Sequence, residues 1–245
     1  MRVLRGLGLA LAVVVLSGAA SAQPARGPLP GVGAEDPRQR VDRRVLPWRA
    51  LGRVQANGAI CTGALIGPRT VLTAAHCLLT RDRRGLVAPG AVHFLLGYHM
   101  GQWFAEARVV SFTVGPAFVT DPNSVAAAAA DWALLTLDAP LGGPGRQLPL
   151  AREAPDARTP LMLAGYQRDR PEVLMADTNC PVVGLAPLPA GGAVLVHGCA
   201  GTLGSSGGPL LAPMGEGGWA IVGVASRVAR DRAQGMAVPA GAVGR

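Results

Sequence analysis

The sequence predicts an all-β protein, and three observations support this prediction. The apolar segments are short, they are separated by turns rich in the chain's 34 Gly and 21 Pro, and none shows the periodicity of a long amphipathic helix. In addition, Asn57-Gly58 separates two short apolar runs, and this dipeptide is the strongest short signal for a β-hairpin. Many short strands joined by frequent turns are typical of barrels and sandwiches.

The first 22 residues predict a secretory signal peptide. Arg2 and Arg5 precede an apolar run over residues 7–16, and Ala20-Ser21-Ala22 has the small-residue pattern of a cleavage site. The apolar run is too short for a membrane span, which needs about 20 residues. We therefore expect a secreted or periplasmic protein without membrane contact after the signal is removed.

Residues 23–44 predict a linker or a short propeptide, because they are rich in Pro, Gly and Arg and lack periodicity. We expect regular structure to begin near Val45. The net charge is +8, and the densest basic stretch lies between Arg38 and Arg53. Trp48 is the single aromatic residue among these arginines, so there is no series of aromatic residues for base stacking. We therefore expect a solvated or disordered arm and no nucleic-acid partner.

The strands are expected where short apolar runs lie between turn residues. In the first half these runs cover residues 53–56, 59–62, 70–73, 91–97, 107–114 and 131–137. In the second half they cover residues 160–165, 182–185, 193–196, 209–211, 219–226 and 236–238. The run Ala126–Ala130 fits either a helical turn or a loop.

Four cysteines in an exported chain predict two disulfides. The sequence allows three pairings, of which the local one, Cys61 with Cys77 and Cys180 with Cys199, is the simplest. Each bridge would close a loop of about 16 to 20 residues and stabilise the fold by about 3 kcal/mol. No CxxC pair is present to complete a zinc site with His93 and His99, so no metal site is expected.

Three segments together could supply a nucleophile, a base and a group that orients the base. His76 lies near the end of CTGALIGPRTVLTAAHC, Asp131 begins DWALL, and Ser206 lies in GSSGGPL. A serine hydroxyl is a weak nucleophile that needs an imidazole to take its proton, and the imidazole needs an acid on its other nitrogen. The glycines allow the N–H groups of Gly204 and Ser206 to point at an oxyanion. Each segment is weak evidence alone, but their conjunction in the order His, Asp, Ser is specific.

An α/β-hydrolase is the alternative that the serine motif raises. The run Gly204–Gly208 also matches G-x-S-x-G, the nucleophile motif of that fold. That fold places its catalytic histidine after the serine, and no histidine follows His197. The βαβ pattern is missing as well, which excludes this class.

The segments TAAHC at 73–77, DWALL at 131–135 and SGGPL at 206–210 resemble the signature blocks of trypsin-like serine peptidases. The resemblance spans about residues 45 to 240 and is nearest to bacterial secreted members related to glutamyl endopeptidases. It implies two six-stranded antiparallel β-barrels, over 45–145 and 146–245, with the active site in the cleft between them. It also implies a serine endopeptidase that acts on proteins or peptides without a cofactor, and we expect a monomer.

The resemblance assigns further residues by their positions. Cys61 and Cys77 match the family's disulfide around the histidine, and Ser226 matches the serine whose backbone pairs with substrate. Ala200 stands where trypsin carries the residue that selects basic side chains, so cleavage after Lys or Arg is not supported. Ala225 stands where glutamyl endopeptidases carry a pocket histidine, so their specificity is not supported either. Arg227 lies near the pocket rim, where it either favours acidic residues or, as we expect, points to solvent.

Ser205 is the clearest departure from the animal enzymes, which have Asp at this position to receive the new N-terminus on activation. Without that acid, we expect the oxyanion turn to be held by neutral hydrogen bonds and activity not to depend on one precise N-terminus. Residues 23–44 should then be trimmable. The alternative function is a noncatalytic binding protein on the same fold, but such relatives usually lose a triad residue, and here all three are present.

Overall fold

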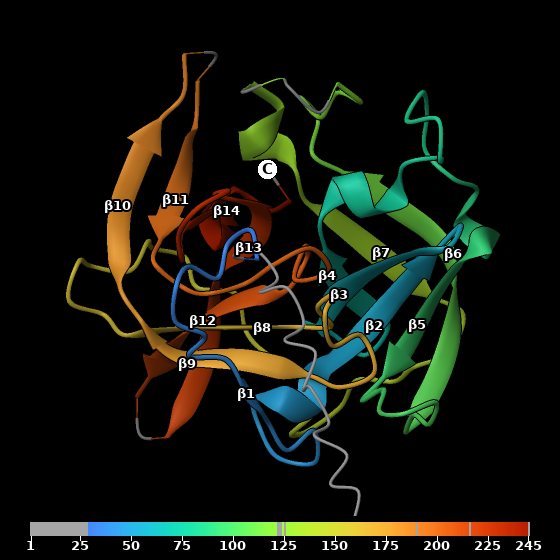
Figure 1. Cartoon of the computed structure of the whole chain (residues 1–245). Coiled ribbons are helices and arrows are strands. Elements are labelled where there is room, and N and C mark those ends of the chain that lie inside the picture. Colours follow the sequence, from blue (N-terminus) through green and yellow to red (C-terminus); the bar gives the residue numbers. More distant parts are fainter. Residues whose placement is uncertain (1–28, 122–123, 125, 190, 216, 245) are drawn as a thin grey trace, which may run out of the picture.

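The computed structural model describes residues 29–244 apart from residues 122, 123, 125, 190 and 216, so the expected signal peptide lies outside the described residues. The chain forms two all-β lobes side by side, with only 3-10 turns as helical structure in the part that is described (Figure 1). None of the helices in these residues is long and apolar enough to cross a bilayer.

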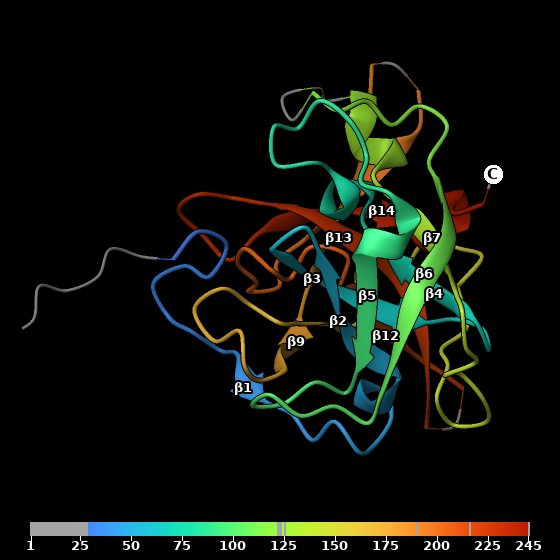
Figure 2. The same cartoon turned by 90° about the vertical axis from the view of Figure 1, so that its right-hand side faces the viewer.

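The first lobe is a closed six-stranded barrel with the strand order β2-β3-β4-β7-β6-β5. Figure 2 looks onto the β5 and β6 side of this barrel. Neighbouring strands are antiparallel, and the hairpin between β2 and β3 turns at Asn57 and Gly58, which both have positive φ. The strands are β2 (Leu51–Ala56), β3 (Ala59–Leu65), β4 (Thr70–Thr73), β5 (Val92–Leu96), β6 (Ala105–Val114) and β7 (Ala133–Leu137).

The second lobe is a curled eight-stranded sheet with the order β1-β9-β8-β12-β13-β14-β11-β10. The all-β class is therefore confirmed, although this lobe is an open, larger sheet where the sequence predicted a closed six-stranded barrel. The strands are β1 (Gln39–Arg40), β8 (Leu161–Gly165), β9 (Met175–Cys180), β10 (Val182–Pro187), β11 (Ala193–His197), β12 (Pro209–Met214), β13 (Gly218–Val228) and β14 (Gly235–Pro239).

Two strands of the second lobe, β1 and β9, have no counterpart among the predicted strands. β9 ends in the polar run Asp177–Asn179, which hides the strand pattern in the sequence. β1 is only two residues long and forms by pairing with β9. The undecided run Ala126–Ala130 is a 3-10 helix, η4.

The N-terminal residues from Leu29 onward are packed against the second lobe, which differs from the linker that their composition predicted. Val32 is 3% exposed, and the Gly31 carbonyl accepts a hydrogen bond from the Gly201 N–H at 2.9 Å. Gly31 is required at this contact, because a Cβ there would lie 2.0 Å from the Gly201 carbonyl oxygen. The expectation that regular structure begins near Val45 was therefore wrong.

Several arginines of this stretch also differ from the expected solvated arm, although Arg40 and Arg44 are exposed. The Arg38 side chain is fully buried and forms ion pairs with Asp36 and Asp169, both at 2.8 Å. Arg43 lies over the Phe104 ring, and Arg53 lies over the Tyr98 ring. Guanidinium groups stack well on aromatic faces, so several of these cations hold the segment to the body of the protein.

The two lobes share one continuous core, which fixes the cleft between them. The largest cluster of buried side chains joins β-strands of the first barrel with Met162, Ala164, Tyr166 and Leu211 of the second lobe. Tyr166 is fully buried, and its hydroxyl donates to the Tyr98 carbonyl at 3.1 Å. The segments that carry His76, Asp131 and Ser206 therefore lie on two lobes that are closely packed together.

Candidate active site

His76 and Asp131 meet at the rim of the first barrel. His76 lies on the 3-10 turn η2 (Ala75–Leu78) directly after β4, and Asp131 lies between η4 and β7. Since β4 and β7 are paired, these two segments emerge side by side. The Asp131 carboxylate accepts the His76 backbone N–H at 2.9 Å and contacts His76 Nδ1 at 2.7 Å. The carboxylate thereby fixes both the position of the ring and its Nδ1–H tautomer.

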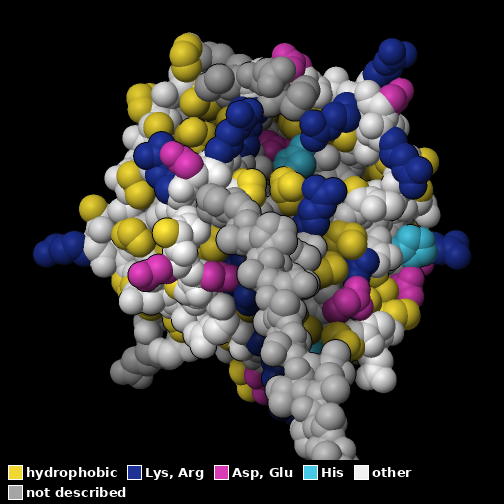
Figure 3. All heavy atoms as spheres, viewed as in Figure 1, with side chains coloured by type: hydrophobic (Ala, Val, Ile, Leu, Met, Phe, Trp, Pro, Cys, Tyr) yellow, Lys and Arg dark blue, Asp and Glu magenta, His cyan; other side chains and the backbone are white. Residues whose placement is uncertain are grey.

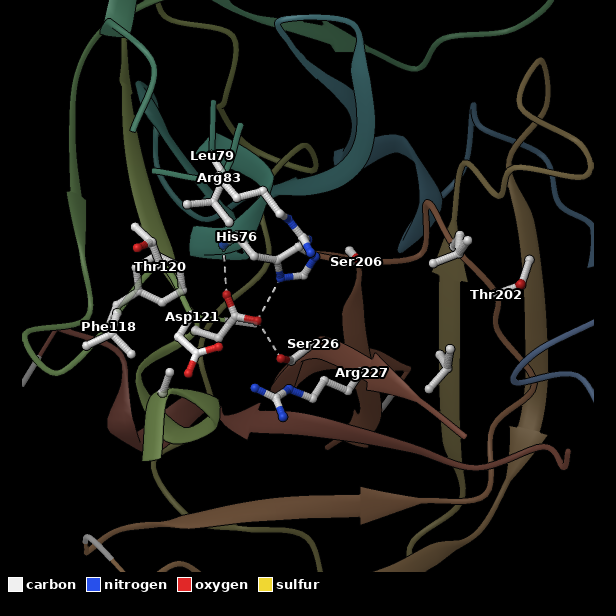
Figure 4. Close-up of a pocket in the computed structure, with 15 residues that line it drawn as sticks. His76, Leu79, Arg83, Phe118, Thr120, Asp121, Thr202, Ser206, Ser226 and Arg227 are labelled. Carbon is white, nitrogen blue, oxygen red and sulfur yellow. Dashed lines mark hydrogen bonds and ion pairs between the residues drawn. The ribbon is translucent and has the colours of Figure 1, made fainter. Parts of the chain in front are cut away.

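Ser226 at the end of β13 completes the shell around the acid. Its hydroxyl donates to Asp131 Oδ2 at 2.5 Å, so one carboxylate oxygen receives two hydrogen bonds (Figure 4). Asp131 is 5% exposed, and burial by itself raises its pKa. The charge and hydrogen bonds of His76, together with the Ser226 hydrogen bond, outweigh burial and hold the pKa of Asp131 below its usual value.

Ser206 lies on the other side of the His76 ring from these hydrogen bonds, as Figure 4 shows. The two side chains line the same two cavities, one of about 330 Å³ and one of about 560 Å³. His76 and Ser206 are both partly exposed there, so a ligand can reach them. The structure thus brings His76, Asp131 and Ser206 together from both lobes.

The turn around Ser206 presents unused backbone donors. Among the described residues, neither the Gly204 N–H nor the Ser206 N–H donates to another protein group. Gly204 has φ +96°, and a Cβ there would lie 2.2 Å from the Tyr166 carbonyl oxygen. Only glycine fits this position, and it gives the peptide the orientation that an oxyanion site needs.

Thr62 of β3 clamps this turn from the first barrel. Its side chain is fully buried, donates to the Gly204 carbonyl and accepts the Tyr166 N–H, both at 2.9 Å. Its backbone N–H donates to the Ser206 carbonyl at 2.9 Å. One residue of the first lobe therefore holds the turn around Ser206 through two hydrogen bonds and the neighbouring Tyr166 through a third.

A second support reaches the same turn from the N-terminal segment. Arg38 Nη1 donates to Gln167 Oε1 at 2.5 Å, and the same oxygen accepts the Thr202 N–H at 2.8 Å. The Thr202 carbonyl in turn accepts both the N–H and the hydroxyl of Ser205, at 2.9 and 2.7 Å. The buried Arg38 charge is balanced by its acidic partners, so it can serve as a fixed anchor.

The narrow space behind Ser206 is a cavity of about 10 Å³, enough for one water-sized group. It is lined by Leu163, His197, Ser205, Ser206, Ala225, Ser226, Arg227 and Val228. The residue that the resemblance placed in the pocket, Ala200, is fully buried, and its N–H donates to Asp177. No carboxylate lines this cavity among the residues that the structure describes.

His197 is the polar side chain that reaches this cavity from β11. Its Nδ1 accepts the Cys199 N–H at 3.2 Å, which places the proton of the neutral ring on Nε2. Nε2 has no hydrogen-bond partner among the described residues. Burial lowers the pKa of His197 to about 4, so the ring is neutral at pH 7.

Arg227 does not point to open solvent, which differs from the simpler expectation. It is half-buried, and its guanidinium donates to the Ser124 carbonyl at 2.7 Å. In Figure 4 the side chain extends toward Asp121, and both residues line the 330 Å³ cavity. Arg227 therefore ties β13 to a loop of the first lobe across this cavity.

The two disulfides follow the local pairing, Cys61–Cys77 and Cys180–Cys199. The first ties β3 to the turn that carries His76, and the second ties β9 to the segment that precedes Ser206. Cys61, His76 and Cys77 lie close enough together to suggest a metal site. The two sulfur atoms are bonded to each other, however, so neither is a thiolate that could bind an ion.

Comparisons with known proteins agree with this geometry. The profile of the trypsin family matches residues 36–242, which is most of the chain. The chain belongs to the trypsin family. The match begins before β1, in agreement with the packed N-terminal segment.

Two proteins that are similar to this chain are both named as glutamyl endopeptidases. A glutamyl endopeptidase of Bacillus licheniformis is 38% identical over 47 residues, which are 19% of this chain and 15% of that enzyme's length. The solved structure of a Glu endopeptidase in complex with MPD has a TM-score of 0.68 at 20% identity, and the match covers 86% of this chain and 95% of the other. At that identity the structural match concerns the fold.

Several residues of the site have no distinctive signal in the sequence. Thr62 contacts Gly204, and Arg38 contacts Gln167, across more than 100 residues of sequence. Ser226 was singled out for its backbone, and the hydrogen bond from its hydroxyl to Asp131 is an additional role. His197 was one of only four histidines, but nothing in its neighbours indicated burial.

Proposed function

We propose that this trypsin-family protein is a secreted serine endopeptidase that uses His76, Asp131 and Ser206 as its catalytic triad. The observation that carries the proposal is the His76 ring held by Asp131 on one side, with Ser206 on the other and two free N–H groups beside it. This is the arrangement that acyl transfer by a serine nucleophile requires.

In this proposal His76 Nε2 takes the Ser206 proton while Ser206 Oγ attacks the peptide carbonyl carbon. The oxygen of the tetrahedral intermediate then accepts hydrogen bonds from the N–H groups of Gly204 and Ser206. His76 returns the proton to the leaving amine, which departs as the acyl-enzyme forms. Water, deprotonated by His76, hydrolyses the acyl-enzyme, and Asp131 stabilises the imidazolium in both halves of the reaction.

Two observations support the proposed secretion. Residues 1–22 have the pattern of a signal peptide, and all four cysteines are paired in disulfides. Disulfides persist in oxidising compartments, which fits the periplasm or the exterior of the cell. The expectation of a monomer stays a prediction.

We also propose that the enzyme disfavours Lys or Arg before the scissile bond. The cavity behind Ser206 is small, and no acid among the described residues that line it could pair with a long cationic side chain. The relatives are named for glutamate, but Ala225 replaces the histidine expected in their pocket wall. Cleavage-site profiling on a mixed peptide library would assign the preference directly.

The test of the activity is labelling by a serine-directed fluorophosphonate, followed by peptide mapping. We expect label on Ser206 of the purified mature protein and no label after Ser206→Ala or His76→Ala. Ser205→Ala is the matched control, because it removes the neighbouring hydroxyl and leaves the nucleophile in place. Cleavage of the peptide library should be lost in the same two variants.

The alternative is a noncatalytic binding protein on the same fold. A folded protein that neither reacts with the probe nor cleaves any library peptide would support this alternative. Label on Ser205, or labelling that does not depend on His76, would contradict the assigned triad.

A further inference from the structure

The 560 Å³ cavity beside the triad has a chemical character that the proposed catalytic steps do not use. Its walls come from the β2–β3 hairpin, the Cys61–Cys77 bridge, residues 79–83 and the segment from Tyr166 to Pro171. It reaches His76, Gly204 and Ser206. A ligand in this cavity therefore lies directly against the reacting groups.

Three arginines, Arg81, Arg83 and Arg168, line this cavity, and no acidic residue does so among the lining residues that the structure describes. All three are exposed. The guanidinium groups of Arg83 and Arg168 form no hydrogen bond or ion pair with any described residue. In Figure 3 dark blue arginine side chains gather around the opening in the upper half of this face.

The acid nearest in the sequence is already engaged elsewhere. Asp82 accepts the Thr80 hydroxyl at 2.5 Å and the Arg84 N–H at 3.2 Å, so its carboxylate caps the turn over residues 80–85. The Thr80 hydrogen bond is the largest cause that lowers the pKa of Asp82. The turn therefore orders its flanking arginines without neutralising them by a direct ion pair.

Arg81 is positioned by the hairpin opposite. Its Nε donates to the Asn57 carbonyl at 3.1 Å, and its guanidinium lies against Gly58. A Cβ at Gly58 would come within 2.9 Å of Arg81 Nη2. The absence of a side chain at this turn thus leaves room for the cation at the edge of the cavity.

The cavity lies on the leaving-group side of Ser206. The other cavity, of about 330 Å³, shares Ser226, Arg227 and Val228 with the small cavity behind Ser206, which the proposed function assigns to the residue before the scissile bond. That cavity also contains two carboxylates, Asp121 and Asp131, which balance Arg227 and the Arg83 side chain that borders both cavities. The unbalanced positive charge is therefore specific to the side that receives residues after the scissile bond.

We propose that this arginine-lined cavity selects substrates with Asp or Glu in the two or three positions after the scissile bond. The inference rests on the proposed endopeptidase function and adds a substrate class to it. Arginine is suited to the task, because its planar guanidinium can pair with a carboxylate through two parallel hydrogen bonds. Each exposed pair contributes roughly a 2- to 5-fold preference.

The test compares two fluorogenic peptides that share the scissile sequence found by library profiling. They differ only at the second and third positions after the cleaved bond, where one carries Glu-Glu and the other Gln-Gln. We expect the wild-type kcat/KM to be about 10-fold higher for the Glu-Glu peptide, mainly through a lower KM. In 0.5 M salt the ratio should fall toward 1, because the pairs are exposed.

The double variant Arg81→Gln/Arg168→Gln should lower the ratio to the roughly 2- to 5-fold that the remaining Arg83 can supply, and cleavage of the Gln-Gln peptide should be unchanged. Arg146→Gln is the matched control, since Arg146 is exposed and lines neither cavity. It removes one positive charge and should keep the ratio. A wild-type kcat/KM ratio near 1, or an unchanged ratio in the double variant, would overturn the inference. Cleavage of the Gln-Gln peptide would in that case still support the proposed endopeptidase activity. Failure to cleave either peptide would overturn both.

Discussion

Lowering the pH should destabilise the fold through His197, and the size of the effect follows from its burial. The imidazole is 1% exposed, its Nδ1 is occupied by the Cys199 N–H, and its Nε2 faces no acceptor among the described residues. A proton on this ring would therefore be a buried charge without a partner. Burial lowers the pKa from 6.5 to about 4.

The sign follows from comparing proton uptake in the two states. The unfolded chain protonates His197 below about pH 6.5, whereas the folded protein does so only near pH 4. The contribution of neutral His197 to the free energy of unfolding thus has its full value above pH 6.5 and decreases as the pH falls toward 4. Between pH 7.5 and 4.5 this group alone should remove about 2.5 kcal/mol.

The assay is urea unfolding at four pH values between 7.5 and 4.5, with Ser206→Ala as the background to prevent self-cleavage. His197→Asn is the matched variant, because the Asn amide oxygen can accept the Cys199 N–H and does not titrate. All other titrating groups are common to both proteins. We expect the stability difference between them to shift by about 2.5 kcal/mol across this range in favour of His197→Asn at low pH. Parallel pH dependence of the two proteins would refute the reasoning.

Three further predictions concern the nucleophile turn and its supports. Thr62→Val should leave the Tyr166 N–H and the Gly204 carbonyl unpaired, which should lower the free energy of unfolding in urea by about 1–3 kcal/mol and kcat by about 10-fold. Thr62→Ser should retain both hydrogen bonds and is the control. Equal kcat values for the two variants would contradict the proposed role of these hydrogen bonds. Gly204→Ala should lower kcat by about 100-fold or more with little change in KM, since its Cβ cannot coexist with the Tyr166 carbonyl, and a kcat near wild type would show that this peptide is not the oxyanion donor. A protein that starts at Val45 lacks Arg38, so it should lose about 3–5 kcal/mol of stability and most of its kcat relative to a protein that starts at Gln23. Unchanged turnover per titrated active site would instead show that residues 23–44 are dispensable.

The sequence alone determined the all-β class, most of the strands and the segments of the proposed triad. The strands could be predicted because short apolar runs between Gly and Pro are a local signal, and Asn57-Gly58 is itself the turn. His76, Asp131 and Ser206 could be predicted because each lies in a distinctive short motif. The local disulfide pairing also followed from small separations along the chain.

Only the tertiary structure decided what holds these segments in place. Arg38 looked like part of a solvated arm, because a sequence does not reveal that Asp169 and Gln167, about 130 residues away, surround its charge. Thr62 is an ordinary strand residue until the second lobe places the nucleophile turn against it. Burial and long-range hydrogen bonding depend on how distant segments pack, so they cannot be predicted from composition or from local sequence pattern. Arg168 is likewise far from Arg81 and Arg83 in the chain, and the three become one surface only when the two lobes fold together.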